Sequence, residues 1–306
     1  MVAILVNKII SLALIMAMGC LVVKLKILRA EDSKVISTLG LYLVMPCVIL
    51  SAFQVDYSPE VKDGFLLALA AAAAIHVLLV VLTWVLKKLL KLDPVEHVSA
   101  MYSNAGNLIF PLVTAILGKD WLIFSSAFCI VQLVLMWSHA KSIICGDKGF
   151  QLKKILGNVN MISILIGALL FFSRLRLPAL LMDTVDTLGG MIGPISMLCT
   201  GMLIGRMDLK KLLRYRRVWL IVALRLILLP LIILPLLKLT AVSVNLANAD
   251  KVLLVTLLAV CGPAATTITQ LSQVHGRDAQ YASAINVFST LLCILTIPLM
   301  VLLYQL

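Results

Sequence analysis

The sequence is divided by charges and turn residues into about ten apolar segments, each close to the length that crosses a membrane. A transmembrane helix needs roughly 20 mostly apolar residues, and residues 65–86 contain no charged side chain at all. We therefore predict an all-α polytopic membrane protein with ten transmembrane helices. The predicted spans are residues 2–23, 35–54, 65–86, 96–117, 120–140, 159–175, 184–204, 217–237, 252–273 and 279–303.

The composition excludes an ordinary soluble enzyme. Hydrophobic residues make up 62% of the chain and charged residues 13%, whereas soluble domains average about 45–50% and about 25%. A formal net charge of +12 would suggest acidic partners in a polar chain. Because these charges lie mostly between apolar segments, we expect the lipid bilayer as the partner and no binding of nucleic acid.

Lysine and arginine differ strongly between alternate loops. The loops after the first, third, fifth, seventh and ninth spans hold 18 basic residues, and the other four loops hold 6. Short loops rich in basic residues face the cytoplasm. We therefore expect a multi-pass protein of the cell membrane with both termini outside.

The reactive side chains give no sign of catalysis or of a bound metal. The seven cysteines lie mostly inside spans and form no CxxC pair, so we expect packing residues without disulfides or metal ligands. The chain has neither an HExxH nor a GxSxG motif, and its four histidines are scattered, which argues against a membrane enzyme. We predict no enzyme activity and no cofactor.

The spacing of prolines suggests two related halves. Pro46 and Pro194 are 148 residues apart, Pro111 and Pro263 are 152 apart, and half the chain is 153 residues. Five crossings reverse the chain, so a second set of five begins on the opposite side of the membrane. We predict a first repeat in residues 1–141, a cytoplasmic linker in 142–157 and a second, inverted repeat in 158–306.

Two spans are polar where the middle of the membrane is expected. A proline within a helix leaves backbone carbonyl and amide groups without their helical hydrogen bonds. Inside the membrane such groups are tolerated only where they face protein or a water-filled cavity. The polar side chains could satisfy this backbone and hold helices together, or they could bind a ligand. The residues concerned are Asn104, Gly106, Asn107 and Pro111 in span 96–117, and Gly262, Pro263, Thr266, Thr267 and Gln270 in span 252–273.

In the second interpretation these residues form a substrate site. Two interrupted helices would meet near the midplane, where the amino ends of their half-helices present N–H groups and partial positive charge. A carboxylate could then bind without a fixed cation. Asn104 and Asn107 would donate amide N–H groups, and Thr266, Thr267 and Gln270 would supply donors from the other half.

Three further polar residues within spans are possible accessory residues of this site. Arg225 could bind carbonyls or headgroups, or it could attract the substrate anion from the cytoplasm. His76 could shuttle protons or remain neutral and hydrogen-bonded inside the bundle. Gln132 could line the cavity or make an interhelical hydrogen bond.

Several segments give the chain a resemblance to a known family. They are residues 43–46 (Leu-Val-Met-Pro), 104–111, 162–178 with Gly167, 193–201 with Pro194, Arg225 with Pro230, Gly262 with Pro263, and 282–298. In order and spacing they resemble the auxin efflux carrier family in its short bacterial form, over essentially the whole chain. Residues 158–160 read Asn-Val-Asn where many relatives carry Asn-Pro. The long loop of the plant carriers shrinks to about residues 142–157, so neither plant regulation nor auxin itself is expected.

The resemblance implies an architecture similar to sodium/proton antiporters and bile-acid symporters. It implies ten helices in two inverted repeats, with spans 96–117 and 252–273 broken and crossing at their prolines. It further implies elevator-type transport of small organic acids, for microbial members dicarboxylates such as malate or malonate, and a possible homodimer.

The function that we predict is a secondary transporter, a permease or efflux carrier, of small organic anions such as mono- or dicarboxylates. A cation-coupled symporter or antiporter is the first alternative, but all 14 acidic residues lie in loops or near the ends of spans and leave no carboxylate at the crossing. The second alternative is a non-transporting receptor or scaffold, which would have no need for paired polar interruptions.

Overall fold

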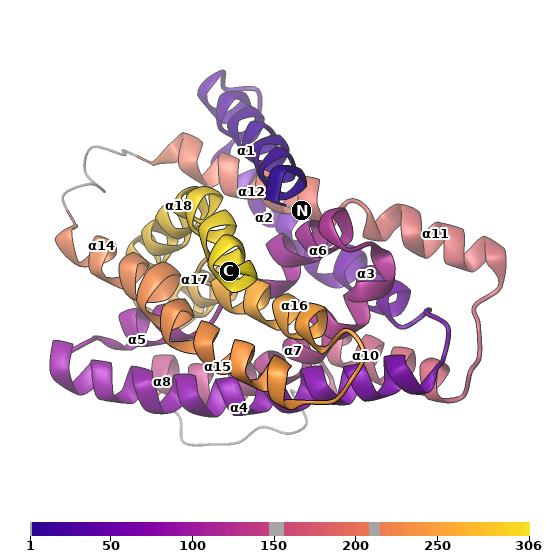
Figure 1. Ribbon diagram of the computed structural model, residues 1–306. Coiled ribbons are helices and arrows are strands. Elements are labelled where there is room, and N and C mark those ends of the chain that lie inside the picture. The colour runs from indigo at the N-terminus through magenta and orange to yellow at the C-terminus, as the bar shows by residue number, and fades with distance from the viewer. Residues whose placement is uncertain (1, 147–155, 208–214) are drawn as a thin grey trace.

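The computed structural model describes residues 2–146, 156–207 and 215–306 and is all-α over these ranges (Figure 1). The α-helices are α1 (Val2–Lys24), α2 (Ser33–Leu39), α3 (Met45–Ala52), α4 (Pro59–Leu90), α5 (Pro94–Met101), α6 (Phe110–Ile116), α7 (Leu122–Leu135), α8 (Lys141–Cys145), α10 (Val159–Phe172), α11 (Ala179–Gly189), α12 (Ile192–Arg206), α14 (Arg216–Ala223), α15 (Leu229–Ser243), α16 (Ala249–Cys261), α17 (Thr266–Val274) and α18 (Ala279–Gln305). Short 3₁₀ or π turns connect or extend them: η1 (Ala30–Asp32), η2 (Gly40–Val44), η3 (Ala105–Ile109), η4 (Lys119–Trp121), η5 (Met136–Ala140) and η6 (Leu224–Leu228).

Seven helical segments of the described chain are long and apolar enough to cross a membrane. They overlap seven of the predicted spans and confirm a polytopic membrane protein. The other three predicted spans are shorter or interrupted: α10 has 14 residues, and spans 96–117 and 252–273 each form two helices with a break between them. The total of ten crossings therefore stays a prediction.

Three of the π turns end just before a proline. η2 ends two residues before Pro46, η3 two residues before Pro111, and η6 two residues before Pro230. A proline ring clashes with the carbonyl four residues earlier and removes one hydrogen bond of the helix. Widening the preceding turn relieves that clash, so these spans continue through their prolines.

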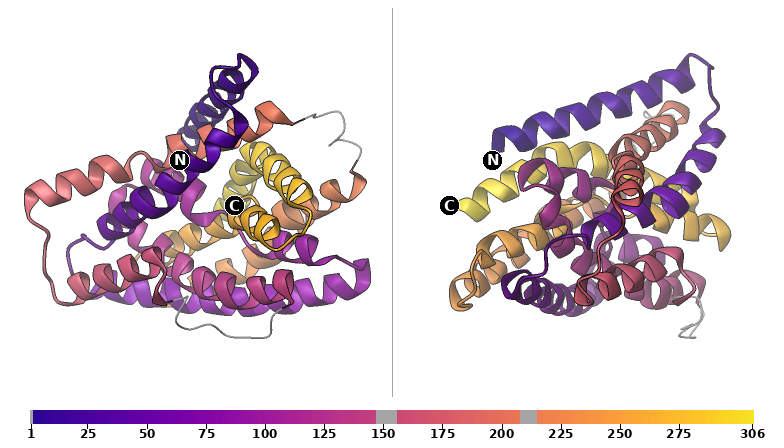
Figure 2. Two further views of the ribbon diagram at one scale, coloured as in Figure 1. Left: turned by 180° about the vertical axis from the view of Figure 1, so that it is seen from behind. Right: turned by 90° about the vertical axis from the view of Figure 1, so that its right-hand side faces the viewer.

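The helices pack as two groups (Figures 1 and 2). In the first, which we call the α1 group, α1 lies along α12, and η1 to α3 pack against α10, α11 and α12. In the second, the α4 group, α4 and α7 pack against α16, and α14 to α17 surround α18. This group also includes α5, which packs against α4 and α18, and η3, α6 and η4, which pack against α7. The two groups meet where α1 contacts α6 and α18, and where α3 and α10 contact α7.

Glycines allow the unusually close approach of α1 and α12. A Cβ atom at Gly201 would lie 1.9 Å from the carbonyl oxygen of Met16, and one at Gly205 would lie 2.9 Å from that of Cys20. Gly201 and Gly205 are four residues apart on one face of α12, the small-residue spacing by which membrane helices pack backbone to backbone. These two positions therefore hold the α1 group together.

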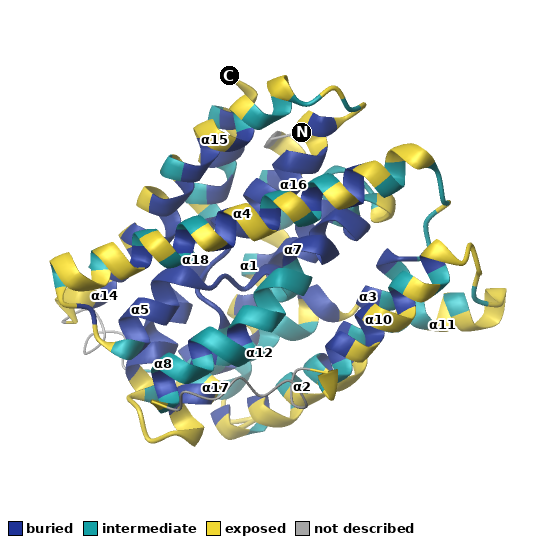
Figure 3. Cartoon of the chain, turned by 90° about the horizontal axis from the view of Figure 1, so that it is seen from below, coloured by how far each residue is buried: buried dark blue, intermediate teal, exposed yellow. Residues whose placement is uncertain are grey.

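The most buried helices are the two that lead into the breaks. Every residue of α5 after Pro94 is buried, and so is every residue of α16 from Val252 to Cys261. Figure 3 shows both as dark helices, whereas α4 carries an exposed stripe. Large apolar side chains such as Leu180 and Val242 are exposed, as expected for a surface that faces lipid.

The two ends of the chain lie near one another in both views of Figure 2. An even number of crossings would place them on the same side of the membrane. The predicted linker, residues 142–157, lies mostly outside the described residues, so the division into repeats at this point stays a prediction.

Gly201→Ala should destabilise the protein although alanine favours a helix by about 1 kcal/mol. Forcing a methyl group against the α1 backbone costs about 1–3 kcal/mol or more. Thermal unfolding in detergent, followed by tryptophan fluorescence, measures this. Gly190→Ala is the matched control, because a Cβ atom there would meet nothing closer than 3.4 Å. Equal melting temperatures for the two variants would contradict the packing account.

Candidate substrate-binding site

The two breaks pair with each other at the centre of the α4 group. The first is Tyr102–Asn104, between α5 and η3, and the second is Gly262–Ala265, between α16 and α17. The amide of Asn104 donates to the carbonyl of Pro263 at 2.7 Å, and the amide of Ala265 donates to that of Tyr102 at 3.0 Å. Ser103 and Ala264 thus form an isolated antiparallel bridge.

The expected crossing at both prolines is wrong for Pro111. Pro263 lies in its break, but Pro111 follows Asn104 by seven residues and sits in the first turn of α6. The π turn η3 before it widens the helix and relieves the clash of its ring with the preceding turn. Its ring packs against α12, where a Cβ atom at Gly193 would approach it within 2.9 Å.

Side chains from two other helices satisfy the paired backbone. Gln132 of α7 accepts from the amide of Ser103 at 3.2 Å and donates to its carbonyl at 2.8 Å. At the second break, Asn286 of α18 donates to the carbonyl of Ala264 at 2.5 Å, and the hydroxyl of Ser289 accepts from the amide of Ala264 at 3.0 Å. Sequence reasoning missed Asn286 and Ser289, because nothing in their own segment indicates a distant break.

Arg225 joins the carboxyl ends of the two helices that lead into the breaks. Its side chain is fully buried. The guanidinium donates to the carbonyls of Ala100 and Met101 at the end of α5, at 3.3 and 3.1 Å. It also donates to those of Val260 and Gly262 at the end of α16, at 2.6 and 3.0 Å. Arg225 is not among the residues lining the cavity described below; its contacts are those of the carbonyl-binding alternative.

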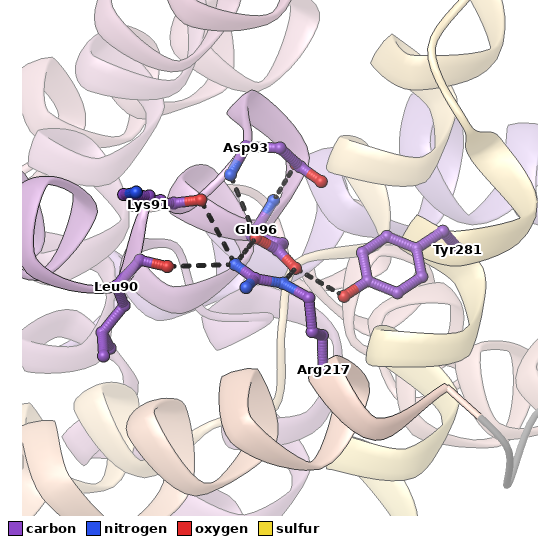
Figure 4. A network of polar contacts seen from close by, with 6 residues as sticks. All are labelled: Leu90, Lys91, Asp93, Glu96, Arg217 and Tyr281. Carbon is purple, nitrogen blue, oxygen red and sulfur yellow. Dashed lines mark hydrogen bonds and ion pairs between the residues drawn. The ribbon is translucent and has the colours of Figure 1, made fainter.

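A second polar contact fixes the start of α5 (Figure 4). The carboxylate of Glu96 is almost fully buried and binds Arg217 through two hydrogen bonds of 2.6 Å. The hydroxyl of Tyr281 donates to the same carboxylate at 2.8 Å. These contacts tie α5 to the starts of α14 and α18, so both ends of α5 are held.

A cavity of about 190 Å³ lies against the crossing. By this measure a single water molecule needs about 10–15 Å³, so a small organic molecule fits. Six of the predicted residues line it: Asn104, Gly106, Asn107, Gln132, Thr267 and Gln270. Other lining residues come from the α1 group, among them Tyr42, Met45, Asn158 and Asn160.

The remaining predicted residues do not line this cavity. Gly262 and Pro263 form the break itself, and Thr266 begins α17 without facing the cavity. His76 is buried on α4, where its Nδ1 donates to the carbonyl of Ala72 at 2.7 Å and its ring packs against Phe128. The lining asparagines of α10 were not predicted as site residues; their polarity just before an apolar span was the available signal.

The amino ends of two helices face the cavity. η3 with α6 begins after Asn104, α17 begins after Ala265, and no side chain caps either start. The first N–H groups of a helix have no partner inside it and carry partial positive charge. Gly106, Asn107 and Thr267 in these first turns line the cavity, so the arrangement is suited to an anion.

The fold is that of a helical membrane protein with several membrane-spanning segments, and comparison with known families identifies it as a transporter rather than an enzyme. A family model described as "Membrane transport protein" matches residues 4–150 and 147–301. The chain belongs to this family, which is that of the auxin efflux carriers. No curated protein matches the chain.

Arg225→Lys should lower both the thermal stability and the affinity for substrate. The ammonium keeps the positive charge but offers three donors for four carbonyls, and buried groups left unpaired cost about 1–3 kcal/mol each. Thermal unfolding and ligand binding in detergent check this. Arg216→Lys, at an exposed position nearby, should change neither. Wild-type behaviour of Arg225→Lys would show that the crossing does not depend on these bonds.

Proposed function

We propose that the protein is a secondary transporter of small organic anions that binds the substrate carboxylate at the crossing. The observation that carries this proposal is the cavity at two uncapped helix starts, lined by Asn104, Asn107, Thr267 and Gln270. Backbone N–H groups and amide side chains are suitable donors to a carboxylate. Membership of a transporter family supports movement of the bound anion across the membrane.

The charges around the crossing favour an anion over a cation. Each helix end carries roughly half an elementary charge. Arg225 lies at the two negative ends and offsets them, so the two positive ends are left facing the cavity. Among the described residues lining it, none is Asp or Glu. Exchange of sodium for protons at the crossing would need such a carboxylate, and this favours the organic anion over the cation-exchanging alternative.

The position of the cavity between the two helix groups supports an elevator mechanism. The α4 group supplies the crossing, and the α1 group supplies the facing wall from Tyr42, Met45 and the start of α10. In this mechanism the α4 group carries the substrate past the α1 group, as the predicted inverted repeats would allow. The ion pair between Lys119 of η4 and Asp186 of α11, at 3.1 Å, joins the two groups and would separate in each cycle.

We further infer that the cavity faces the cytoplasm in this conformation. Its wall includes Asn158 and Asn160 at the start of α10 and Trp137 near the end of the preceding span. The start of α10 and the end of the preceding span both lie beside the predicted linker. The linker is one of the loops rich in basic residues, which are expected on the cytoplasmic side. In this orientation both termini lie outside. Residues of one chain line the site, so binding there does not require the predicted homodimer.

Asn104→Ala and Gln270→Ala should each weaken binding of an organic acid such as malate. A hydrogen bond to a charged group contributes about 1.5–3 kcal/mol, which is about a tenfold to hundredfold change in affinity. Asn104→Ala leaves its backbone bond to Pro263 in place. Thermal shift and uptake into vesicles check both variants, with Thr269→Ala, a threonine of α17 that does not line the cavity, as control. Unchanged affinity and transport in both variants would end the proposal.

A covalent link between the two helix groups should stop transport but not binding. In a background with all seven cysteines replaced by alanine, positions 119 and 186 are changed to cysteine and joined by a short bifunctional maleimide. The matched control joins positions 31 and 206, because Glu31 and Arg206 form an ion pair at 2.6 Å within the α1 group. Transport that survives the first link would contradict movement between the groups.

A further inference from the structure

The wall opposite the crossing has a polar centre of its own at the start of α10. Asn158, Val159, Asn160 and Ile164 line the cavity there. The side chain of Asn158 caps the helix, because its Oδ1 accepts from the amide of Asn160 at 2.9 Å. This wall belongs to the α1 group, so it is separate from the donors that the crossing supplies.

Asn160 has a hydrogen-bonding group without a partner among the residues that the structure describes. Its residue is only 6% exposed, and its Oδ1 is buried without any hydrogen bond. Leaving such a group unpaired is unfavourable, and a ligand in the cavity that the residue lines would complete it after rotation of the side chain. The amide can rotate to present either its oxygen or its nitrogen, and it can therefore accept from a hydroxyl or donate to a carboxylate.

The helix start favours the donor role. α10 has 14 residues, and its first turn brings a third amino end, with its partial positive charge, to the cavity. Apolar side chains also line the cavity: Met45, Ile49, Phe110, Leu133, Met136 and Ile164. The cavity thus combines donors from both helix groups with apolar surface.

We propose that Asn160 determines specificity by binding a second polar group of the substrate, most strongly a carboxylate, while the crossing binds the first. This inference rests on the proposed function. It predicts preference for an acid with a polar group at each end over one of equal length that ends in a methyl group. Succinate and butyrate are such a pair.

Binding of succinate and butyrate to the full-length protein in detergent, measured by calorimetry, tests this proposal. Asn160→Ala should lower the affinity for succinate about tenfold and leave that for butyrate unchanged. Asn160→Asp keeps the shape of the side chain, and its negative charge should weaken succinate binding further. Ser163→Ala is the control, because Ser163 lies on the same helix outside the cavity lining.

The outcomes separate this inference from the function on which it rests. Equal losses for both acids in Asn160→Ala, or no loss for either, would overturn the role of Asn160. Asn104→Ala should weaken both acids alike, because it removes a donor to their common carboxylate. A further outcome is that Asn104→Ala leaves the affinity for both acids unchanged while Asn160→Ala still lowers only that for succinate. That result would contradict carboxylate binding at the crossing but support the contact with Asn160. If the wild-type protein binds neither acid, both proposals fail.

Discussion

The hydrogen bonds from Arg225 to four carbonyls are the contacts on which the crossing depends. They join the carboxyl ends of α5 and α16, two negative ends that would otherwise face one another inside the most buried part of the molecule. A buried cation is costly unless it is fully hydrogen-bonded, and here the helix ends satisfy it. The same contacts leave the amino ends of η3 and α17 free on the cavity side. One buried charge therefore joins the broken helices and, in the proposed function, leaves the cavity suited to an anion.

The polar residues near the crossing have two different tasks. Gln132, Asn286 and Ser289 satisfy the paired backbone at Ser103 and Ala264, as polar residues commonly do between membrane helices. Asn104, Asn107, Thr267 and Gln270 line the cavity, and within the described parts of the chain none of these four side chains hydrogen-bonds to another side chain. The structural interpretation of the polar segments thus applies to one set of residues and the ligand-binding interpretation to another. Gln132 fits both, because it bonds to Ser103 and also lines the cavity. This division explains how a break in the membrane interior can be stable and still bind a ligand.

The apolar segments and their two polar interruptions are local signals, so the helical membrane fold and the position of the crossing along the chain could be predicted from sequence. The exact residues of the first break could not be predicted from sequence. A π turn accommodates Pro111, and the helix is interrupted at Tyr102 to Asn104 instead. Asn286 was missed because its partner Ala264 lies 22 residues away in the sequence, and Asn160 was missed because its place in the cavity lining depends on the packing of distant segments. The close packing of α1 and α12 had a sequence signal, the spacing of Gly201 and Gly205, but its partner Met16 appears only in three dimensions.

Binding of a carboxylate by the freed amino ends can be observed directly at the backbone amide of Gly106. Ala105 and Gly106 form the only Ala-Gly pair in the sequence, so carbonyl-labelled alanine combined with nitrogen-labelled glycine selects this one peptide bond for nuclear magnetic resonance in bilayers. The account predicts a saturable shift of this resonance on titration with succinate, following the binding isotherm, and no shift with its dimethyl ester. Saturable binding of succinate without any change at Gly106 would contradict it.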